Sequence, residues 1–362
     1  MRKSSKLYTC IVVAAGLGLL SARMAIADDT EPKTRQVDCS KHNDTIQKIV
    51  DKVKHGRPTV ILVSGTCAED VSIHKDDVTL KGNPGATVKG TVSITGARRV
   101  AVESLRITGS GPGIVATGNA SISVRDSQLD HNALAGILVR DGAHADITGN
   151  AITDNGQSQP PSAGRGVLVN DGASASVKSN TISDNYSDGI GVFNDAYARL
   201  EDNTIERNGR AAVFDAGLQI SRARVVANGN RYRDNPYAAI AAYNSSTYRT
   251  GTFLTAAGDA DNLFAFEQIV QGTGQTAVEM GRLSLVDLRQ VNVTGQIFVG
   301  NHSQLQIRGD RAGPNKTCSS VNGNISASST FSVVRLRTTQ VNGIIFIGPD
   351  ARLIGGSICP PF

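Results

Sequence analysis

One seven-residue phrase returns four times in the middle of the chain and decides the fold. It reads GNAITDN at residues 149–155, SNTISDN at 179–185, DNTIERN at 202–208 and GNRYRDN at 229–235, with a weaker copy at 126–132. The second Asn of the copies falls at residues 132, 155, 185, 208 and 235, in steps of 23, 30, 23 and 27. The 30-residue step contains an insertion, GQSQPPSA. The underlying period is therefore about 23 residues.

Three short apolar-alternating runs fill each period. The first begins with Gly or Ala, as at 136–139, the second begins with Ala, as at 143–147, and the third is the Asn-x-Ile phrase. No helical pattern separates the runs, which excludes βαβ units, and the register returns on every third run, which excludes hairpins. We therefore predict an all-β, single-stranded right-handed parallel β-helix, in which each period makes one turn and like strands stack about 4.8 Å apart.

The same sequence pattern extends beyond the middle of the chain. Looser copies at 88–94, 293–297, 321–325 and 341–345 predict one solenoid domain over residues 59–362. The repeat is hard to phase between 244 and 281, where we expect an irregular coil or a long loop.

The ends of a solenoid need covering. Within the N-terminal segment, residues 28–58, Ile46, Ile49, Val50 and Val53 have helical spacing. They predict an amphipathic capping helix over 44–54, with Asn43 or Asp44 as its N-cap.

Residues 1–27 resemble a secretory signal peptide. Basic residues come first, an apolar run follows at 7–20, and Ala25-Ile26-Ala27 supplies a cleavage pattern. We expect an exported protein, periplasmic or extracellular. The apolar run is too short to cross a bilayer, and no other stretch is longer, so no membrane span is expected.

Export changes the meaning of the charge. The chain holds 37 Lys and Arg against 32 Asp and Glu, a formal charge of +5, but four of the basic residues belong to the leader. The remainder carries 33 basic and 32 acidic side chains. A nucleic-acid partner, which a basic chain would favour, is therefore not expected.

We expect the protein to be a monomer.

The cysteines fit an oxidising compartment. Cys10 leaves with the leader, and Cys39, Cys67, Cys318 and Cys359 remain. An even count predicts two disulfides with three connectivities. We favour Cys39–Cys67 and Cys318–Cys359, because each pair lies near one end of the chain. Their spacing matches no zinc site.

The coils resemble a known superfamily. Asn-x-Ile-x-x-Asn turns with Gly-Ile-x-Val strands are similar to those of right-handed parallel β-helix proteins, which include pectate lyases, polygalacturonases and alginate epimerases. The resemblance implies the fold and a polysaccharide partner. The Gly-His-Gly of polygalacturonases and the Asp-Pro-His-Asp of alginate epimerases are missing, and a chain without Trp cannot carry pectate-lyase signatures that contain it. No catalytic residue can be carried over, and whether the protein is an enzyme stays open.

The two Asn columns of the repeat have a structural interpretation. Stacked side-chain amides would bond the turn backbone and each other. A ligand could use such a row, but turn bonding is the simpler role.

The candidate catalytic residues are Asp154, Asp184 and Arg165. The two aspartates should be neighbours in successive coils, beside the insertion that leads to Arg165. Paired carboxylates could perform acid/base work or hold Ca²⁺, and Arg165 could bind a sugar carboxylate. The alternative is that Asp before Asn is a turn residue. No other cofactor is expected.

Candidate substrate-binding residues project outward from two strands of the repeat. Aromatic rings interleaved with polar groups on a flat face suit a polysaccharide, although a solvated sheet face is the alternative. The set consists of Arg140, His144, Asp146, Phe193, Tyr197, Arg199 and Tyr243.

Two functions therefore remain open. One is an exported β-helix that recognises and processes a polysaccharide as a lyase, epimerase or hydrolase. The other is a non-catalytic β-helix that binds a glycan or a partner, or that has a structural role in the envelope.

Overall fold

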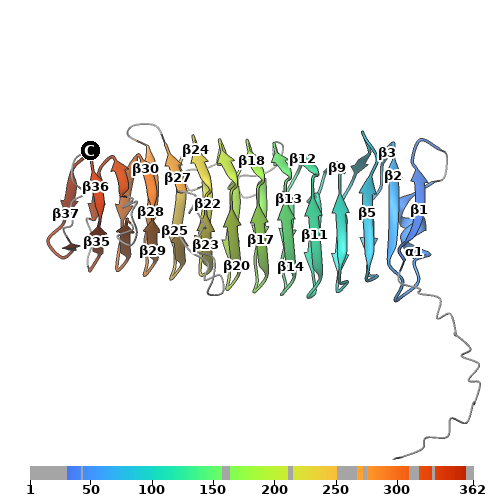
Figure 1. Ribbon diagram of the computed structural model, residues 1–362, viewed down its shortest axis with the longest axis horizontal. Helices are drawn as coiled ribbons and strands as arrows, with labels where there is room; N and C mark the ends of the chain where they lie inside the picture. Colours follow the sequence, from blue (N-terminus) through green and yellow to red (C-terminus); the bar gives the residue numbers. More distant parts are fainter. Residues whose placement is uncertain are drawn as a thin grey trace, which may run out of the picture. The chain divides into compact units, whose positions relative to one another are not determined.

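The computed structural model describes residues 31–41, 44–156, 164–210, 215–250, 267–271, 275–309, 318–327 and 331–355. The predicted leader, most of the insertion after residue 156 and Cys359 lie outside these residues. The described chain winds through three parallel sheets, called A, B and C here, whose strands stack side by side (Figure 1).

The strands follow one another through the sheets in a fixed order. Sheet A contains β1 (Lys33–Asp38), β2 (Thr59–Ser64), β5 (Val78–Gly82), β8 (Val100–Glu103), β11 (Ser121–Arg125), β14 (His144–Thr148), β17 (Ser174–Lys178), β20 (Tyr197–Glu201), β23 (Arg224–Asn228), β26 (Thr247–Thr250), β29 (Leu285–Arg289), β32 (Gln304–Arg308), β35 (Val333–Arg337) and β38 (Arg352–Gly355). Sheet B contains β3 (Thr66–Cys67), β6 (Thr87–Lys89), β9 (Arg106–Gly109), β12 (Gln128–Asn132), β15 (Ala151–Thr153), β18 (Thr181–Ser183), β21 (Thr204–Glu206), β24 (Arg231–Arg233), β27 (Glu267–Val270), β30 (Val291–Thr294), β33 (Ser319–Asn322) and β36 (Thr339–Val341). Sheet C contains β4 (Val71–Ile73), β7 (Val92–Thr95), β10 (Ile114–Thr117), β13 (Ala135–Val139), β16 (Arg165–Val169), β19 (Ile190–Phe193), β22 (Ala216–Ser221), β25 (Ala238–Tyr243), β28 (Thr276–Met280), β31 (Gln296–Val299), β34 (Ile325–Ala327) and β37 (Ile345–Ile347).

From β2 onward each strand pairs in parallel with the strand three places later in the chain, as the repeat predicts. His144 of β14, for example, lies opposite Ser121 of β11 on one side and Ser174 of β17 on the other. The predicted fold class, an all-β parallel β-helix, is confirmed.

The core consists of apolar columns that run from turn to turn. Leu129, Ile152, Ile182, Ile205 and Tyr232 stand in register in sheet B and are completely buried. Burying one such side chain stabilises the fold by about 1.5–3 kcal/mol. Each side chain is covered mainly by its copies in adjacent turns, so the turns stabilise one another.

The Asn columns have the structural role that the sequence favours. Asn185 is buried, and its Nδ2 donates to the Ile152 carbonyl at 3.0 Å and to Asn208 Oδ1 at 2.9 Å. Its own Oδ1 accepts from the backbone N of Asn155 at 3.2 Å. The amides therefore replace the ladder hydrogen bonds that the chain loses at each corner.

The N-terminal end differs in detail from the prediction. Strand β1 pairs with β2 and adds a strand before the first predicted one. Helix α1 (Ile46–Asp51) is short, and its N-cap is Thr45, so the predicted caps Asn43 and Asp44 are wrong. The reason is a tertiary contact: the Glu69 carboxylate accepts from the backbone N of Ile46 at 2.7 Å and of Gln47 at 3.0 Å.

One predicted disulfide is confirmed. Cys39 and Cys67 are bonded, with their Cα atoms 5.1 Å apart, and they tie the segment after β1 to β3. Cys318 is also disulfide-bonded. Its predicted partner, Cys359, lies outside the described residues.

The poorly phased stretch continues the solenoid where it is described. Tyr248 of β26 lies between Val225 and Val286, and β28 pairs with β25 and β31. The expected irregularity does not reach these strands. Residues 251–266 lie outside the described chain.

Candidate functional site

The connections from sheet B to sheet C differ in length along the solenoid. Residues 184–189 join β18 to β19 by a short path, between the longer connections 154–164 and 207–215. Charged side chains from these three consecutive turns meet at this corner. They form two groups, one toward sheet C and one toward sheet B.

The group toward sheet C is centred on Asp188, whose side chain is 0% exposed. Its Oδ2 accepts from Arg165 Nε at 2.8 Å, and its Oδ1 accepts from the backbone N of Ala216 at 2.9 Å. Burial raises the pKa of Asp188 to about 6, although the Arg165 charge and the Ala216 amide favour the ionised form. The nearby Asp215 carboxylate adds to the rise.

Asp215 is the second carboxylate of this group. It is also buried, and its Oδ1 accepts from the Ser187 hydroxyl at 2.9 Å. Together with Asp188 it connects β16, the connection 184–189 and the start of β22. The carboxylates of Asp188 and Asp215 and the guanidinium of Arg165 thus share a largely buried corner of the solenoid.

Arg165 extends from the buried carboxylate toward the surface. Its side chain is 20% exposed, and the guanidinium carbon lies 5.1 Å from the centre of the Phe193 ring. Gly191 makes room for this contact, since a Cβ there would lie 2.6 Å from Phe193 Cε2. Asp188 therefore fixes Arg165 in an orientation that a cation–π contact also favours.

A tyrosine pair lies farther along the same sheet. The hydroxyl groups of Tyr237 and Tyr243 are 3.1 Å apart, and the Tyr237 hydroxyl donates to Glu279. Burial and the Glu279 charge raise the pKa of Tyr237 to about 12, and burial raises that of Tyr243 as well. Both rings pack on a small apolar cluster on the outside of the sheet, formed by Ala216, Ala238 and Ala241. Both tyrosines therefore stay protonated near neutral pH, and the Tyr237 proton is engaged by Glu279.

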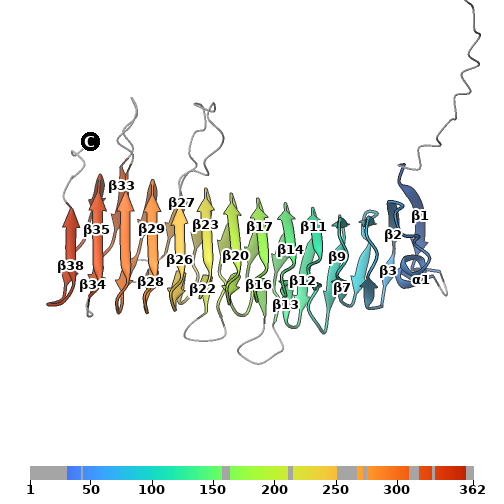
Figure 2. The ribbon, with the colours of Figure 1, turned by 90° about the horizontal axis from the view of Figure 1, so that it is seen from below.

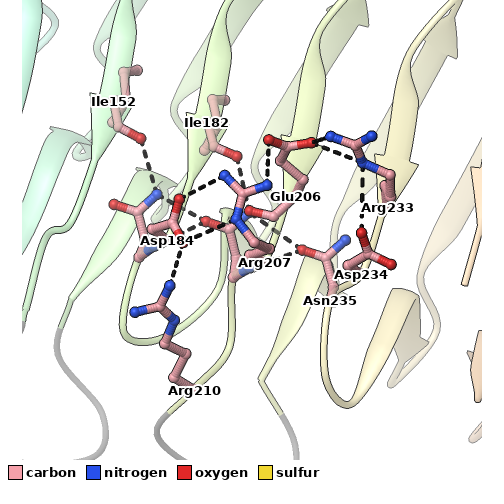
Figure 3. Close-up of polar contacts among 11 residues, drawn as sticks. Ile152, Ile182, Asp184, Glu206, Arg207, Arg210, Arg233, Asp234 and Asn235 are labelled. Atoms are coloured by element: carbon pink, nitrogen blue, oxygen red, sulfur yellow. Dashed lines mark hydrogen bonds and ion pairs between the residues drawn. The ribbon is translucent and has the colours of Figure 1, made fainter. Parts of the chain in front are cut away.

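The group toward sheet B contains the predicted Asp184. Asp154 and Asp184 occupy equivalent places in successive turns, each directly after a paired strand residue. Asp184 does not meet Arg165. Instead it accepts from Arg207 Nε at 3.1 Å and Nη2 at 2.8 Å, and from Arg210 (Figure 3).

This group continues as a chain of alternating charges. Arg207 also donates to Glu206 at 2.6 Å, and Glu206 accepts from Arg233 Nε at 3.0 Å, as Figure 3 shows. Partial burial alone would raise the pKa values of Asp184 and Glu206, but the hydrogen bonds and charges of the arginines hold both below their usual range. A carboxylate so stabilised is a poor proton donor, and its oxygens are already occupied.

The predicted binding residues divide between two faces. His144 and Tyr197 share a row of sheet A with Ser174 between them, and Asp146 and Arg199 share the next row with Ser176 between them. Phe193 and Tyr243 share a row of sheet C, separated by Ser221. Arg140 follows β13 of that sheet.

Asp188, Asp215, Tyr237 and Glu279 are functional candidates that the repeat pattern does not predict. For Asp188 the sequence does contain a signal. Arg165 and Asp188 both directly precede the Gly of a Gly-Val or Gly-Ile strand in successive coils, so opposite charges occupy one column. Asp215 and Glu279 had no comparable signal.

Neither a metal cluster nor a membrane helix stands out in the described part of the chain. The group of potential ligands found there is Cys39, Cys67 and Glu69. The two sulfur atoms form a disulfide and Glu69 caps α1, so these residues do not form a metal site. No helix among the described residues has the length and hydrophobicity needed to cross a bilayer.

Comparisons with known proteins agree with this architecture. Residues 90–253 match the family model described as right handed beta helix region. The structure is similar to the A-module of the mannuronan C-5 epimerase AlgE4 from Azotobacter vinelandii, with a TM-score of 0.52 and 14% identity over 86% of this chain and 95% of that chain. It is also similar to pectate lyase Pel9A, with a TM-score of 0.45 and 12% identity over 89% of this chain and 79% of that chain.

No curated protein matches the chain in sequence. At 14% identity, the similarity to the epimerase module shows a shared fold and nothing more. The chain therefore has the fold of a right-handed parallel β-helix.

Proposed function

We propose that the protein is exported and binds a polysaccharide on the outer face of sheet C, beside the connection 184–189. The observation that carries the proposal is the Arg165 guanidinium, held by the buried Asp188 against the partly exposed ring of Phe193. An aromatic face stacks on the CH groups of a sugar, and a guanidinium donates to its hydroxyl or carboxylate oxygens. A mannuronan epimerase module with the same fold supports a carbohydrate role.

The geometry favours binding because the two groups are already ordered. Asp188 accepts from Arg165 on the protein side, so little side-chain entropy remains to be lost when a sugar arrives. Tyr237 and Tyr243 add partly exposed ring surface farther along the sheet, in the direction that a polymer would follow.

Export has its own support and its own test. The leader-like residues 1–27 and the Cys39–Cys67 disulfide both fit an oxidising compartment. Expression of the full chain in a bacterial host, followed by cell fractionation and N-terminal sequencing, should yield a periplasmic or extracellular protein that begins near Asp28. Retention of the whole chain in the cytoplasm would contradict export.

Binding can be tested with a panel of immobilised polysaccharides. The Phe193→Ala and Arg165→Ala variants should each bind at least about tenfold more weakly, the equivalent of roughly 1.4 kcal/mol. Phe298→Ala is the matched control, since Phe298 is 38% exposed on β31 of the same sheet but distant from Arg165 in strand order. Equal affinities for all three variants would contradict the proposed site.

Processing of the polymer is a second candidate, favoured by the raised pKa of Asp188. A carboxyl that titrates at about pH 6 can donate and accept protons near neutrality, provided that substrate binding opens its buried site. Product formation can be followed by reducing ends and by absorbance of unsaturated sugars. Asp188→Asn should abolish it, while the exposed Asp195→Asn should not. A glycan that is bound without any product would favour the non-catalytic role.

A further inference from the structure

The outer face of sheet A changes character along the solenoid. In strands β23 to β38 its outward positions carry seven arginines and a single acid, Asp287. The earlier strands β5 to β20 mix both signs, with Lys81, Arg125, Lys178 and Arg199 against Glu103, Asp146 and Glu201. We call the seven arginines the arginine stripe: Arg224, Arg249, Arg289, Arg308, Arg335, Arg337 and Arg352.

The strand register brings these side chains close together. Arg289, Arg308 and Arg337 stand opposite one another on β29, β32 and β35. Neighbouring strands are about 4.8 Å apart, so three like charges follow one another along the solenoid. Figure 2 shows the strands β23, β26, β29, β35 and β38 of this sheet in sequence. Like charges that lie directly opposite one another destabilise a sheet. Such an arrangement is expected at a functional surface, where a bound ligand neutralises the charges.

Asp287 shows how this face holds a carboxylate. It is nearly buried, and its Oδ1 accepts from Arg308 Nε at 3.1 Å while its Oδ2 accepts from Nη2 of the same guanidinium. Arg289 Nε lies 4.0 Å from the same carboxylate. No carboxylate among the described residues forms an ion pair with Arg249, Arg335, Arg337 or Arg352, and all four are exposed. Within the described residues, these guanidinium groups are therefore not neutralised by an acidic side chain and can pair with anions from outside.

From these contacts we infer that the arginine stripe binds a carboxylated polysaccharide, extended along the solenoid axis. Guanidinium groups pair with carboxylates in a bidentate manner, and their repeat along the sheet matches a chain that carries charges at regular intervals. The outward positions of β23, β26, β29, β32, β35 and β38 contain no aromatic residue, so the stacking platform typical of single-stranded nucleic-acid sites is absent from these strands.

This surface is distinct from the one proposed on sheet C. The two lie on different sheets, and the Arg165–Phe193 pair belongs to β16 and β19, before the stripe begins. The inference therefore does not depend on the proposed function. It adds a second contact surface for polymers that carry charge.

The test compares two triple variants of the full chain with the same change in charge. Arg249→Gln, Arg335→Gln and Arg337→Gln together alter the stripe, and Lys81→Gln, Arg125→Gln and Lys178→Gln together alter the other half of the same sheet. The probe is polygalacturonate, with its fully methyl-esterified form as the uncharged comparison. We expect the stripe variant to bind polygalacturonate at least about tenfold more weakly and with a smaller salt dependence, and the control variant to bind within about twofold of the unmodified chain.

Several results would overturn the inference. These are an equal loss in both triple variants, equal binding of the methyl ester, or no binding of polygalacturonate by the unmodified chain. Preferential binding of a single-stranded DNA of similar charge would assign the stripe to nucleic acid instead. The Phe193→Ala variant separates the two surfaces, because it should leave the binding at the stripe unchanged even if the sheet C proposal fails.

Discussion

Arg165 Nε donates to Asp188 Oδ2 at 2.8 Å, and Asp188 is completely buried while Arg165 reaches the surface. The pair joins two successive turns at a sheet corner, where the chain could have placed apolar residues. Replacing buried ion pairs by apolar groups often leaves stability unchanged or improves it. Its observable effect here is to fix the orientation of a guanidinium beside Phe193.

The buried carboxyl predicts a stability change on the acidic side of neutrality. Burial holds the pKa of Asp188 at about 6, above its ordinary value of 3.8. Between about pH 4 and pH 6 the folded chain keeps a proton that the unfolded chain releases, so the free energy of unfolding falls as the pH rises and then levels off. The loss is on the order of 3 kcal/mol.

Asp188→Asn should remove this dependence. Urea unfolding from pH 4 to pH 7 would measure the difference between the variant and the unmodified protein, which isolates this carboxyl from the others. Asp195→Asn is the control, because Asp195 is exposed and its φ of 61° suits Asn as well as Asp. Parallel profiles for Asp188→Asn and the unmodified chain would refute the expectation.

Glu206 should act in the opposite direction. Its pKa lies below the usual value, because the hydrogen bonds and charges of Arg233 and Arg207 outweigh partial burial. Its contribution to stability is therefore complete above about pH 4.5 and is lost as the pH falls through the folded-state value. Glu206→Gln should destabilise the protein by about 1–2 kcal/mol at pH 7 and by less at pH 3. Urea unfolding at both pH values tests this, with Glu103→Gln on sheet A as the control. An equal loss at both pH values would show that packing, not charge, is responsible.

The Asn column predicts a large cost for a small change. Asn185→Ala removes the amide that donates to Ile152 and Asn208 and leaves the backbone N of Asn155 without its acceptor. Because these groups are buried, we expect a loss of about 3 kcal/mol. Asn170→Ala, whose partners Asp171 and Asn194 lie at an exposed corner, should cost about 0.5 kcal/mol or less. Similar thermal shifts for the two variants would contradict a structural role of the column.

The repeat predicts the fold because every coil obeys the same local rules. An inward Ile at 152 or 182 and an Asn at 155 or 185 face their own copies, so the period of about 23 residues determines which residues meet. Where a coil departs from the rule, the sequence is less informative. Thr45 caps α1, and not Asn43 or Asp44, because Glu69 in the connection between β3 and β4 completes the cap.

The candidate site lies largely where the repeat is broken. Asp188 and Asp215 lie close together at connections of different length, 184–189 and 207–215. Because these connections do not align residue by residue, the repeat cannot predict which of their side chains meet. The repeat places Asp184 beside Asp154, but it does not predict the ion pairs of Asp184. Their partners, Arg207 and Arg210, belong to the next turn. The arginine stripe could not be predicted from the nearly balanced net charge, because the net charge does not show how the charged residues are distributed over the surface.

The substitution Gly191→Ala tests the sheet C site by adding a single methyl group. A Cβ at this position would lie 2.6 Å from Phe193 Cε2 and 3.1 Å from Arg165 Cδ. Both atoms belong to side chains that can move, so Gly191→Ala should displace the ring from the guanidinium and change the free energy of unfolding by less than about 1 kcal/mol. Affinity for the polysaccharide should fall about as much as in Phe193→Ala, roughly tenfold. Gly111→Ala is the control, because its Cβ would meet only the Thr91 side chain, far from β19 in strand order. If Gly191→Ala keeps full affinity, the contact between Arg165 and Phe193 does not contribute to binding. If it unfolds the chain, the glycine is required for packing, and the Phe193→Ala variant must decide the role of the ring.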